Sequence, residues 1–351
     1  MPDIPKLTHP WFVAAWPGMG HVALNAGVYL LSKLGMTAVA EFEGGELFDV
    51  TQVVVKGGVI QPARRPRNRF FVWTDPRKRN DLVVFLGEAQ PPVGKFPFCR
   101  QVIDYARELG VERVITFAAM ATDMRPEHPS RVFGAATDED GVAELRRLDV
   151  TILEEGNIGG LNGVLLGAAA ASGLRGTCFL GEMPQVFAQV PFPKASLAIL
   201  EAFTLLTGVN LDMDELAEQA HAVEEQLGDL LSRVEDQYGE QTEHGDEDDE
   251  DEEDEEDEDE DEEDDEDDDT NFAGNEIAVE PENAPEHEGI GYQYVGPDES
   301  VPPSSVQRIE ELFGRAASDR TKAFELKREL DRLGLFKRYE DRFLDLFKQP
   351  E

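Results

Sequence analysis

The chain has 351 residues and a formal net charge of −42, and residues 246–269 are all Asp or Glu. That run carries 24 of the charges and leaves −18 on the other 327 residues, a balance that a folded body tolerates. Binding to nucleic-acid phosphates requires a basic face, so the composition argues against a nucleic-acid partner. An apolar content of 40% is sufficient for a sizeable core.

The cysteine content and the start of the chain bear on its compartment. Cys99 and Cys178 have no C-x-x-C spacing and cannot build a disulfide framework, so we expect two buried free thiols. The first residues, MPDIPKLTHPWFV, lack the basic and long apolar regions of a signal peptide. No stretch approaches 18 consecutive apolar residues. These features predict a soluble, cytoplasmic protein with no membrane partner.

The acidic run divides the chain into three parts. Residues 1–237 read as an α/β domain with a trailing amphipathic helix. Residues 238–303 read as a disordered acidic linker, because like charges repel and have no apolar surface to bury. Residues 304–351 read as a C-terminal helical segment.

The body alternates strand-like and helix-like segments. Strands are expected at 11–16, 37–42, 49–55, 69–74, 81–88, 112–120, 131–137, 150–155 and 175–182, and helices at 21–35, 98–110, 139–148, 161–173 and 194–208. Gly35 suits the position just after the first helix. Because several strands are continuously apolar, the pattern predicts an α/β fold with a mainly parallel sheet covered on both faces.

Two later regions carry apolar stripes at helical spacing. The first resembles a coiled coil and either packs on the body or forms an oligomer seam; its residues are Leu216, Ala220, Val223, Leu227, Leu230 and Val234. Asp212 and Glu215 suggest its N-terminal cap, and Ser304 with Gln307 suggests a capping box for the C-terminal helices. The aromatic residues Phe336, Tyr339, Phe343 and Phe347 must dock on the body, another subunit or a partner.

The first candidate site is the loop Pro17-Gly18-Met19-Gly20-His21, between the first strand and the first helix. Ligands of open α/β sheets bind beyond the carboxyl ends of strands, where glycines let backbone N–H groups approach an anion. The loop lacks the Lys-Ser/Thr of a P-loop and a full G-x-G-x-x-G pattern. A ligand contact by Gly18, Met19 and Gly20 and a tight structural turn therefore both remain open.

The second candidate site is the stretch from Glu154 to Gly163, which also joins a strand to a helix. Asn162 could cap the helix and Asn157 could adopt a positive φ, or both could orient a ligand. Glu154 and Glu155 point to opposite faces if the strand continues through them, which disfavours a paired acid/base site. The possible ligand contacts here are Glu155, Gly156, Asn157, Gly159, Asn162 and Gly163.

Other patterns bear on catalysis and metal binding. In GAATDE (134–139), Thr137 or Asp138 is expected to cap the next helix. No G-x-S-x-G elbow occurs, and the six histidines are scattered without metal-ligand spacing. The sequence therefore indicates no catalytic residue, no metal and no cofactor.

A basic cluster follows the third expected strand of this acidic chain. We interpret it as a solvated hairpin rim or as an electrostatic docking site, with the acidic run as one candidate partner. The partner-binding candidates are Arg64, Arg65, Arg67 and Arg69, and Arg77, Lys78 and Arg79 follow them.

The loops in this order resemble the proteasome assembly chaperone 2 family. The resemblance covers residues 8–235 and rests on PGMG (17–20), GAATDED (134–140), EEGNIGGLNGVLLG (154–167), CFLGEMPQ (178–185) and PFPKASLAILEAF (191–203). It implies a three-layer α/β sandwich like that of nucleoside phosphorylases and hydrolases. It also implies homo-oligomers and, as in characterised members, a chaperone role in proteasome assembly. Proteasome-activating tails end in a hydrophobic residue, a tyrosine and one more residue, whereas this chain ends Gln349-Pro350-Glu351.

Two functions compete at this point. The first is a non-enzymatic, oligomeric chaperone or scaffold, a homo-oligomer such as a trimer, with a proteasome-related protein as one candidate client. The second is a nucleoside- or phosphate-type binder or hydrolase that uses the Gly-rich loops at the strand ends.

Overall fold

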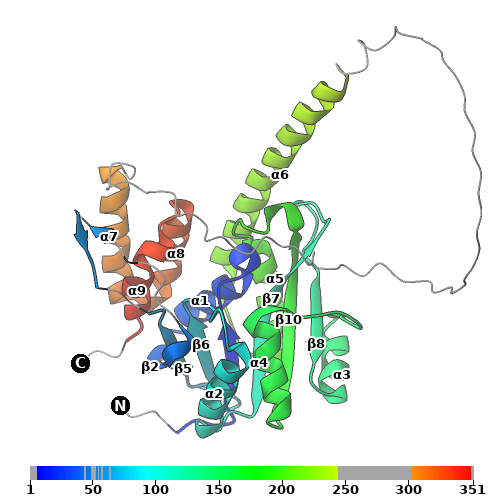
Figure 1. Ribbon diagram of the computed structural model, residues 1–351, viewed down its shortest axis with the longest axis vertical. Coiled ribbons are helices and arrows are strands. Elements are labelled where there is room, and N and C mark those ends of the chain that lie inside the picture. The colour runs from blue at the N-terminus through cyan, green and yellow to red at the C-terminus, as the bar shows by residue number, and fades with distance from the viewer. Residues whose placement is uncertain are drawn as a thin grey trace, which may run out of the picture. The chain divides into compact units, whose positions relative to one another are not determined.

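The structure is a computed structural model that describes residues 6–42, 45–48, 53, 55–56, 58–62, 65–243 and 302–348 (Figure 1). Contacts divide the chain into two compact units. One comprises Met1–Gly228 with Gly296–Glu351, and the other comprises Asp229–Val295. The acidic run lies outside the described residues, as does most of the predicted linker, so the three-part division stays a prediction.

The described residues of the first unit contain an eight-stranded mixed sheet in the order β2-β5-β6-β1-β7-β10-β8-β9. Its strands are β1 (Trp11–Ala15), β2 (Thr37–Phe42), β5 (Asn68–Trp73), β6 (Leu82–Gly87), β7 (Arg113–Thr122), β8 (Val132–Ala136), β9 (Thr151–Ile152) and β10 (Arg175–Pro184). A separate ribbon pairs β3 (Val55–Lys56) with β4 (Val59–Ile60). Of the predicted strand 49–55, most residues lie outside the described part.

The centre of the sheet is parallel and its flanks contain antiparallel pairs. β1 pairs in parallel with β6 and β7, and β7 pairs in parallel with β10. β5 is antiparallel to β2 and β6, and β8 is antiparallel to β10. The continuous apolar runs thus form the buried centre, and the carboxyl ends of β1, β6, β7 and β10 meet at one edge, called here the carboxyl end of the sheet.

Helices connect these strands and cover both faces. In the body they are α1 (Val22–Lys33), α2 (Lys95–Glu108), α3 (Glu139–Arg147), α4 (Gly160–Ala171), α5 (Pro193–Thr207) and α6 (Asp214–Glu243). The C-terminal segment, residues 302–348, forms α7 (Pro303–Ser318), α8 (Ala323–Arg332) and α9 (Phe336–Asp345). The α/β sandwich with additional C-terminal helices confirms the predicted fold class.

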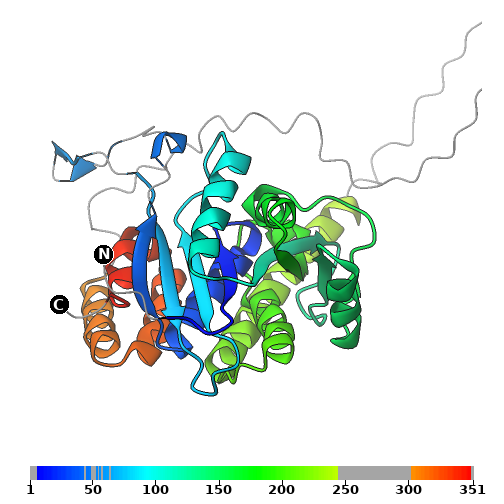
Figure 2. The same cartoon turned by 90° about the horizontal axis from the view of Figure 1, so that it is seen from below.

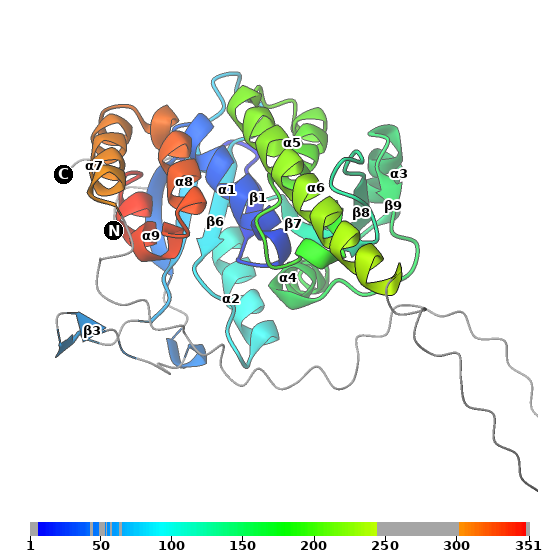
Figure 3. The same ribbon diagram turned by 90° about the horizontal axis from the view of Figure 1, so that it is seen from above.

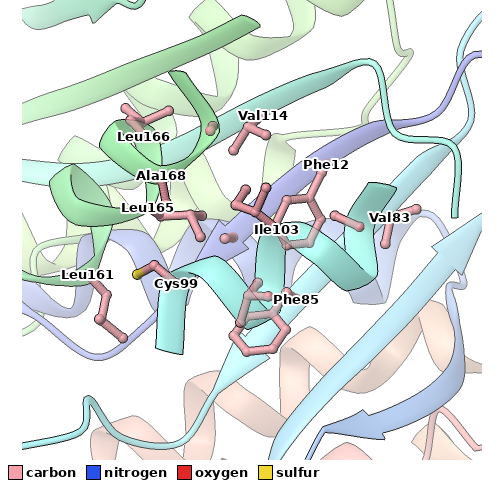
Figure 4. Packing of buried hydrophobic residues seen from close by; sticks show 14 of the residues in the cluster. Phe12, Val83, Phe85, Cys99, Ile103, Val114, Leu161, Leu165, Leu166 and Ala168 are labelled. Atoms are coloured by element: carbon pink, nitrogen blue, oxygen red, sulfur yellow. The ribbon is translucent and has the colours of Figure 1, made fainter. Parts of the chain in front are cut away.

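One face of the sheet packs against α2 and α4. Figure 4 shows Phe12 and Phe85 of the strands facing Ile103 of α2 and Leu165 of α4, all of them fully buried. Cys99 and Cys178 are buried free thiols in a helix and a strand, as predicted. Their burial raises the pKa of each thiol to about 12.

The other face packs against α1, α5 and the C-terminal segment; α8 and α9 lie beside α1 in Figure 3 and across the sheet from α2 in Figure 2. The N-terminal half of α6 is anchored in the first unit, where Leu216 and Leu227 are buried. Within α6, Leu230 and Val234 are 47% and 39% exposed, so the stripe splits into a buried and an exposed half.

The starts of α7, α6 and α3 test the expected caps. α7 begins at Pro303 with Pro302 as its N-cap, so the prediction that Ser304 caps this helix is wrong. Proline at the first position fits a helix start because it has no N–H to leave unpaired. α6 begins at Asp214, whose N–H donates to the Asp212 carboxylate at 3.1 Å. For α3, Asp138 is the cap as predicted and accepts from the Gly141 N–H at 2.7 Å.

Candidate functional site

The first loop, residues 17–21, leaves β1 at the carboxyl end of the sheet. Gly20 has φ +57°, and a Cβ there would lie 2.6 Å from Met183 Sδ. Its N–H donates to the Ala188 carbonyl at 2.8 Å, and its carbonyl accepts from the Phe192 N–H at 2.9 Å. Gly20 is therefore fixed by packing against the segment after β10, a structural role that the sequence left open.

Its neighbours in the first loop are less enclosed. Met19 is 45% exposed, and a Cβ on Gly18 would have no atom within 4 Å outside its chain neighbours. His21 also has a positive φ, of 51°. Its pKa is lowered by burial first and by the nearby Lys327 ammonium second. Gly18 and Met19 thus form the accessible part of the loop.

The second loop, residues 154–163, wraps the start of α4. The helix begins at Gly160 with Gly159 as its N-cap, so Asn162 lies in the first turn and the prediction that it caps the helix is wrong. The positive φ values belong to Gly156 (141°) and Gly160 (66°), because glycine adopts them without a Cβ clash; the prediction that Asn157 does so is wrong.

Side-chain exposure divides the second loop. Glu155 and Asn157 are exposed, whereas Asn162 is 8% exposed, and its Oδ1 has no hydrogen-bond partner among the described residues. A Cβ on Gly163 would lie 1.8 Å from the Ile158 carbonyl oxygen, far inside any allowed contact. Gly163 is thus required by the close approach of the loop backbone.

Gln90, which the sequence reasoning missed, joins the two loops. It follows β6, and its Nε2 donates to the Pro17 carbonyl at 3.2 Å while its Oε1 accepts from the Leu161 N–H at 3.1 Å. The structure therefore brings the first and second loops together at the carboxyl end of the sheet. The available signal was a polar residue just after a buried strand, at the edge where α/β ligands bind.

A charged pair lies farther along this edge, at the end of β10. Glu182 is 2% exposed and accepts from Arg131 Nε at 2.8 Å and from Thr122 Oγ1 at 2.9 Å. The hydrogen bond from Arg131 lowers the pKa of the Glu182 carboxyl. Since buried carboxylates need such partners, we read this pair as structural.

The basic cluster contacts the chain's own C-terminal segment. Arg69, only 3% exposed, donates from Nη2 to Asp341 Oδ1 at 2.8 Å, and Arg67 Nη1 donates to the same oxygen at 3.1 Å. Arg67 also donates from Nε to Glu41 at 2.6 Å, and this bond lowers the pKa of Glu41. Arg65 is exposed, and Arg64 lies outside the described residues.

A cavity of about 520 Å³ lies at the amino ends of the central strands, opposite the carboxyl end of the sheet. Its lining includes Trp11, Arg113, Glu144 and Arg175. Arg113 Nη1 pairs with Glu144 at 2.7 Å, and Arg175 Nε pairs with Asp138 at 3.0 Å. Arg113 and Arg175 are thus neutralised by adjacent carboxylates, which fits a structural ion-pair network.

Two further observations concern the described residues alone. They contain no group of three His, Cys, Asp or Glu side chains that could hold a metal ion. Within the same ranges, every helix is too short or too polar to cross a membrane.

The mixed sheet, the helices on both faces and the paired Gly-rich loops define an α/β-sandwich protein with loops joined at the carboxyl end of its sheet. The PAC2 family model matches residues 12–231, which span the sheet, both loops and most of α6. The chain belongs to the PAC2 family. The C-terminal segment lies beyond the match.

Solved structures agree with this assignment. Pyrococcus furiosus PbaB, an archaeal proteasome activator, is 28% identical with a TM-score of 0.57, and the match covers 66% of this chain and 96% of PbaB. A PAC2 family protein from Streptomyces avermitilis is 28% identical with a TM-score of 0.55, covering 63% and 95%. Pyrococcus furiosus PbaA, an archaeal homolog of proteasome-assembly chaperone, is 25% identical with a TM-score of 0.52, covering 69% and 95%.

Proposed function

We propose that this chain is a non-enzymatic, cytoplasmic assembly chaperone or scaffold of the PAC2 type that acts on a proteasome-related protein client. The observation that carries the proposal is its 28% identity to PbaB, a proteasome activator, over 96% of the PbaB chain. The likeness to PbaA points the same way.

The geometry of the loops supports a scaffold. Gly20 and Gly163 are explained by contacts of the backbone with Met183 and Ile158, without any ligand. A catalytic or phosphate-binding loop would place such glycines around a substrate. In this chain the two glycines instead allow close packing of one part of the backbone on another. The rigid loops would present Met19 and Asn157, both exposed, to a protein partner.

The client is tested with purified components. The full chain is mixed with separately purified proteasome subunits from the same organism, and native mass spectrometry follows complexes and assembly intermediates. We expect a complex between this chain and proteasome subunits, and faster formation of the assembled particle. Absence of both with folded, assembly-competent subunits would refute the proposal.

We further propose that the chain acts as a homo-oligomer, with a trimer as the proposed state. The exposed half of the α6 stripe, Leu230 and Val234, is an apolar surface that such an assembly would bury. Light scattering at micromolar concentration should give a multiple of the chain mass. Leu230→Asp with Val234→Asp should dissociate it, whereas the exposed-site control Ser232→Asp with Gln237→Asp should not. A single-chain mass at every concentration would exclude the oligomer.

One observation favours a second candidate function, small-molecule binding. Gln90 joins the two loops where α/β sheets bind ligands, and Asn162 Oδ1 is buried without a partner among the described residues. Phosphate, nucleosides and nucleotides are added in a thermal-unfolding assay. A ligand at 100 times its Kd should add about 2.7 kcal/mol of stability, an effect that Asn162→Ala should remove and Glu154→Gln should keep. Unchanged unfolding with all of them would exclude this candidate.

A further inference from the structure

The C-terminal segment covers an aromatic surface of the body. The Tyr29 ring of α1 meets Phe324 of α8 edge to face, with centroids 4.4 Å apart. Phe71 of β5 meets Phe347 with centroids 6.2 Å apart. Phe324, Phe347 and Phe343 are almost fully buried. The predicted aromatic face of the segment therefore docks on the body, one of the three options that the sequence left open.

Hydrogen bonds to backbone groups of the segment fix its position on this surface. Ser32 Oγ of α1 donates to the Arg320 carbonyl at 3.1 Å and accepts from the Phe324 N–H at 3.1 Å. The Ala38 N–H of β2 donates to the Phe347 carbonyl at 2.7 Å. Because β2 is an edge strand of the sheet, the end of the segment satisfies part of an otherwise open edge.

A buried lysine adds selectivity to the apolar contact. Lys327 of α8 is fully buried, donates from Nζ to Asn25 Oδ1 at 2.6 Å, and pairs with Asp331. A buried charge is tolerated only with such partners, so the hydrogen bond to Asn25 favours this position of α8 over others. Lys337 Nζ of α9 donates to the Glu88 carbonyl at 3.0 Å.

Charge complementarity completes the contact. The α9 region reads Asp341-Arg-Phe343-Leu-Asp345-Leu-Phe347, with carboxylates and rings at alternate positions. Asp341 and Asp345 face Arg69 of β5 and Arg67, which directly precedes that strand: Arg69 Nη2 lies 2.8 Å from Asp341 and 3.6 Å from Asp345, and Arg67 Nη1 lies 3.1 Å from Asp341. Two carboxylates and two rings of the segment thus meet two arginines and the rings of Phe71 and Tyr29 on the body.

We propose that residues 302–348 are a separable module that docks reversibly on the body, and that the surface under them is a recognition site for a helical segment that carries the pattern Asp-x-Phe-x-Asp-x-Phe. The occupant is the chain's own segment. The family match ends at residue 231, so the PAC2 fold carries the docking surface and the segment is an addition that fits it. This proposal is independent of the proposed function.

The full chain tests the proposal after a single cut. A protease site is inserted between Gly274 and Asn275, outside the described residues, and the purified protein is cleaved. Size-exclusion chromatography and native mass spectrometry then measure whether the C-terminal fragment stays bound. A fluorescent peptide of residues 302–348 is added in excess to measure exchange. We expect retention of the fragment at micromolar concentration and its replacement by the peptide.

Charge reversal provides the matched comparison. Asp341→Lys with Asp345→Lys should weaken retention of the fragment at least about 100-fold. The attraction of the two carboxylates to Arg69 is lost, and the buried Arg69 then lies beside two positive charges. Glu310→Lys with Glu311→Lys makes the same charge change in α7, at exposed side chains, and should leave retention within about threefold.

Three results would overturn the proposal: prompt separation of the wild-type fragment, failure of the peptide to replace it, or equal retention of the two charge-reversed variants. Circular dichroism shows whether the Asp341→Lys, Asp345→Lys variant folds. If it does not fold, replacement of the wild-type fragment by the peptide is the measurement that tests the proposal.

Discussion

The Gly-rich loops and the docked C-terminal segment both bring distant parts of the chain together, but by different forces. In the loops, backbone lies on backbone: Gly163 faces the Ile158 carbonyl, and Gly20 exchanges hydrogen bonds with Ala188 and Phe192. The segment instead adds charged side chains to its ring contacts, such as Lys327 against Asn25. Gly20 and Gly163 should therefore tolerate no added atom, whereas the segment should respond to charge and salt.

The largest effect is expected at Gly163. Gly163→Ala places a Cβ 1.8 Å from the Ile158 carbonyl oxygen, so the loop must move, and we expect a loss of more than about 4 kcal/mol of unfolding free energy. Gly167→Ala is the matched control in the same helix, because a Cβ there meets no atom within 4 Å; it should stabilise by up to about 1 kcal/mol. Chemical denaturation measures both. Equal effects would show that the loop backbone is not tightly packed.

The buried lysine gives the next largest effect. Lys327→Met leaves the Asp331 carboxylate without its partner and should cost about 3 kcal/mol. Lys327→Met combined with Asp331→Leu removes both charges and should recover most of that loss. Arg328→Met, at an exposed neighbouring position, is the control and should have little effect. If the double variant is no more stable than Lys327→Met, the cost of that substitution does not come from the unpaired Asp331 carboxylate.

A smaller, pH-dependent effect is expected at Glu182. The Arg131 hydrogen bond holds its pKa below the ordinary value of 4.5, so the folded state gains stability above that value and loses it as pH falls through the lowered pKa. The melting temperature of the wild type should exceed that of Glu182→Gln, and this difference should be largest above pH 5 and should shrink as the solution becomes more acidic. Glu155→Gln, at an exposed residue, should show no such trend. A melting-temperature difference that does not change with pH would show that the charge of Glu182 is not the cause.

The smallest effect is expected for the acidic run. Residues 246–269 have no apolar side chain for a core, and their self-repulsion opposes compaction at low salt. Deleting them should leave the melting temperature unchanged or slightly raised in calorimetry. A loss of many degrees would mean that the run is bound to the folded chain.

Sequence periodicity and local capping rules predicted the features that depend on neighbours in the chain. The α/β order, the Asp138 cap and Gly35 after α1, with φ +57°, all follow from local chemistry. For α4 the same rules offered Asn162 as a cap, whereas the helix begins at Gly160 with Gly159 as its N-cap.

Features that depend on remote partners could not be read from the sequence. Gln90 acquires its role from Pro17 and Leu161, which are 73 and 71 residues away. The arginine cluster was noticed, but its partner Asp341 lies 272 residues from Arg69. Composition offered the acidic run as one candidate partner, whereas the structure places two carboxylates of the C-terminal segment against Arg69.

Amide hydrogen exchange of the intact protein at about 0.1 M and 1 M NaCl tests the contrast between the two regions most directly. Two reporter amides serve: the Ala38 N–H, bonded to Phe347 of the segment, and the Phe192 N–H, bonded to Gly20 of the first loop. Charge-assisted docking predicts that high salt speeds exchange at Ala38 by about tenfold and leaves Phe192 unchanged. Equal responses of the two amides to salt would contradict the account.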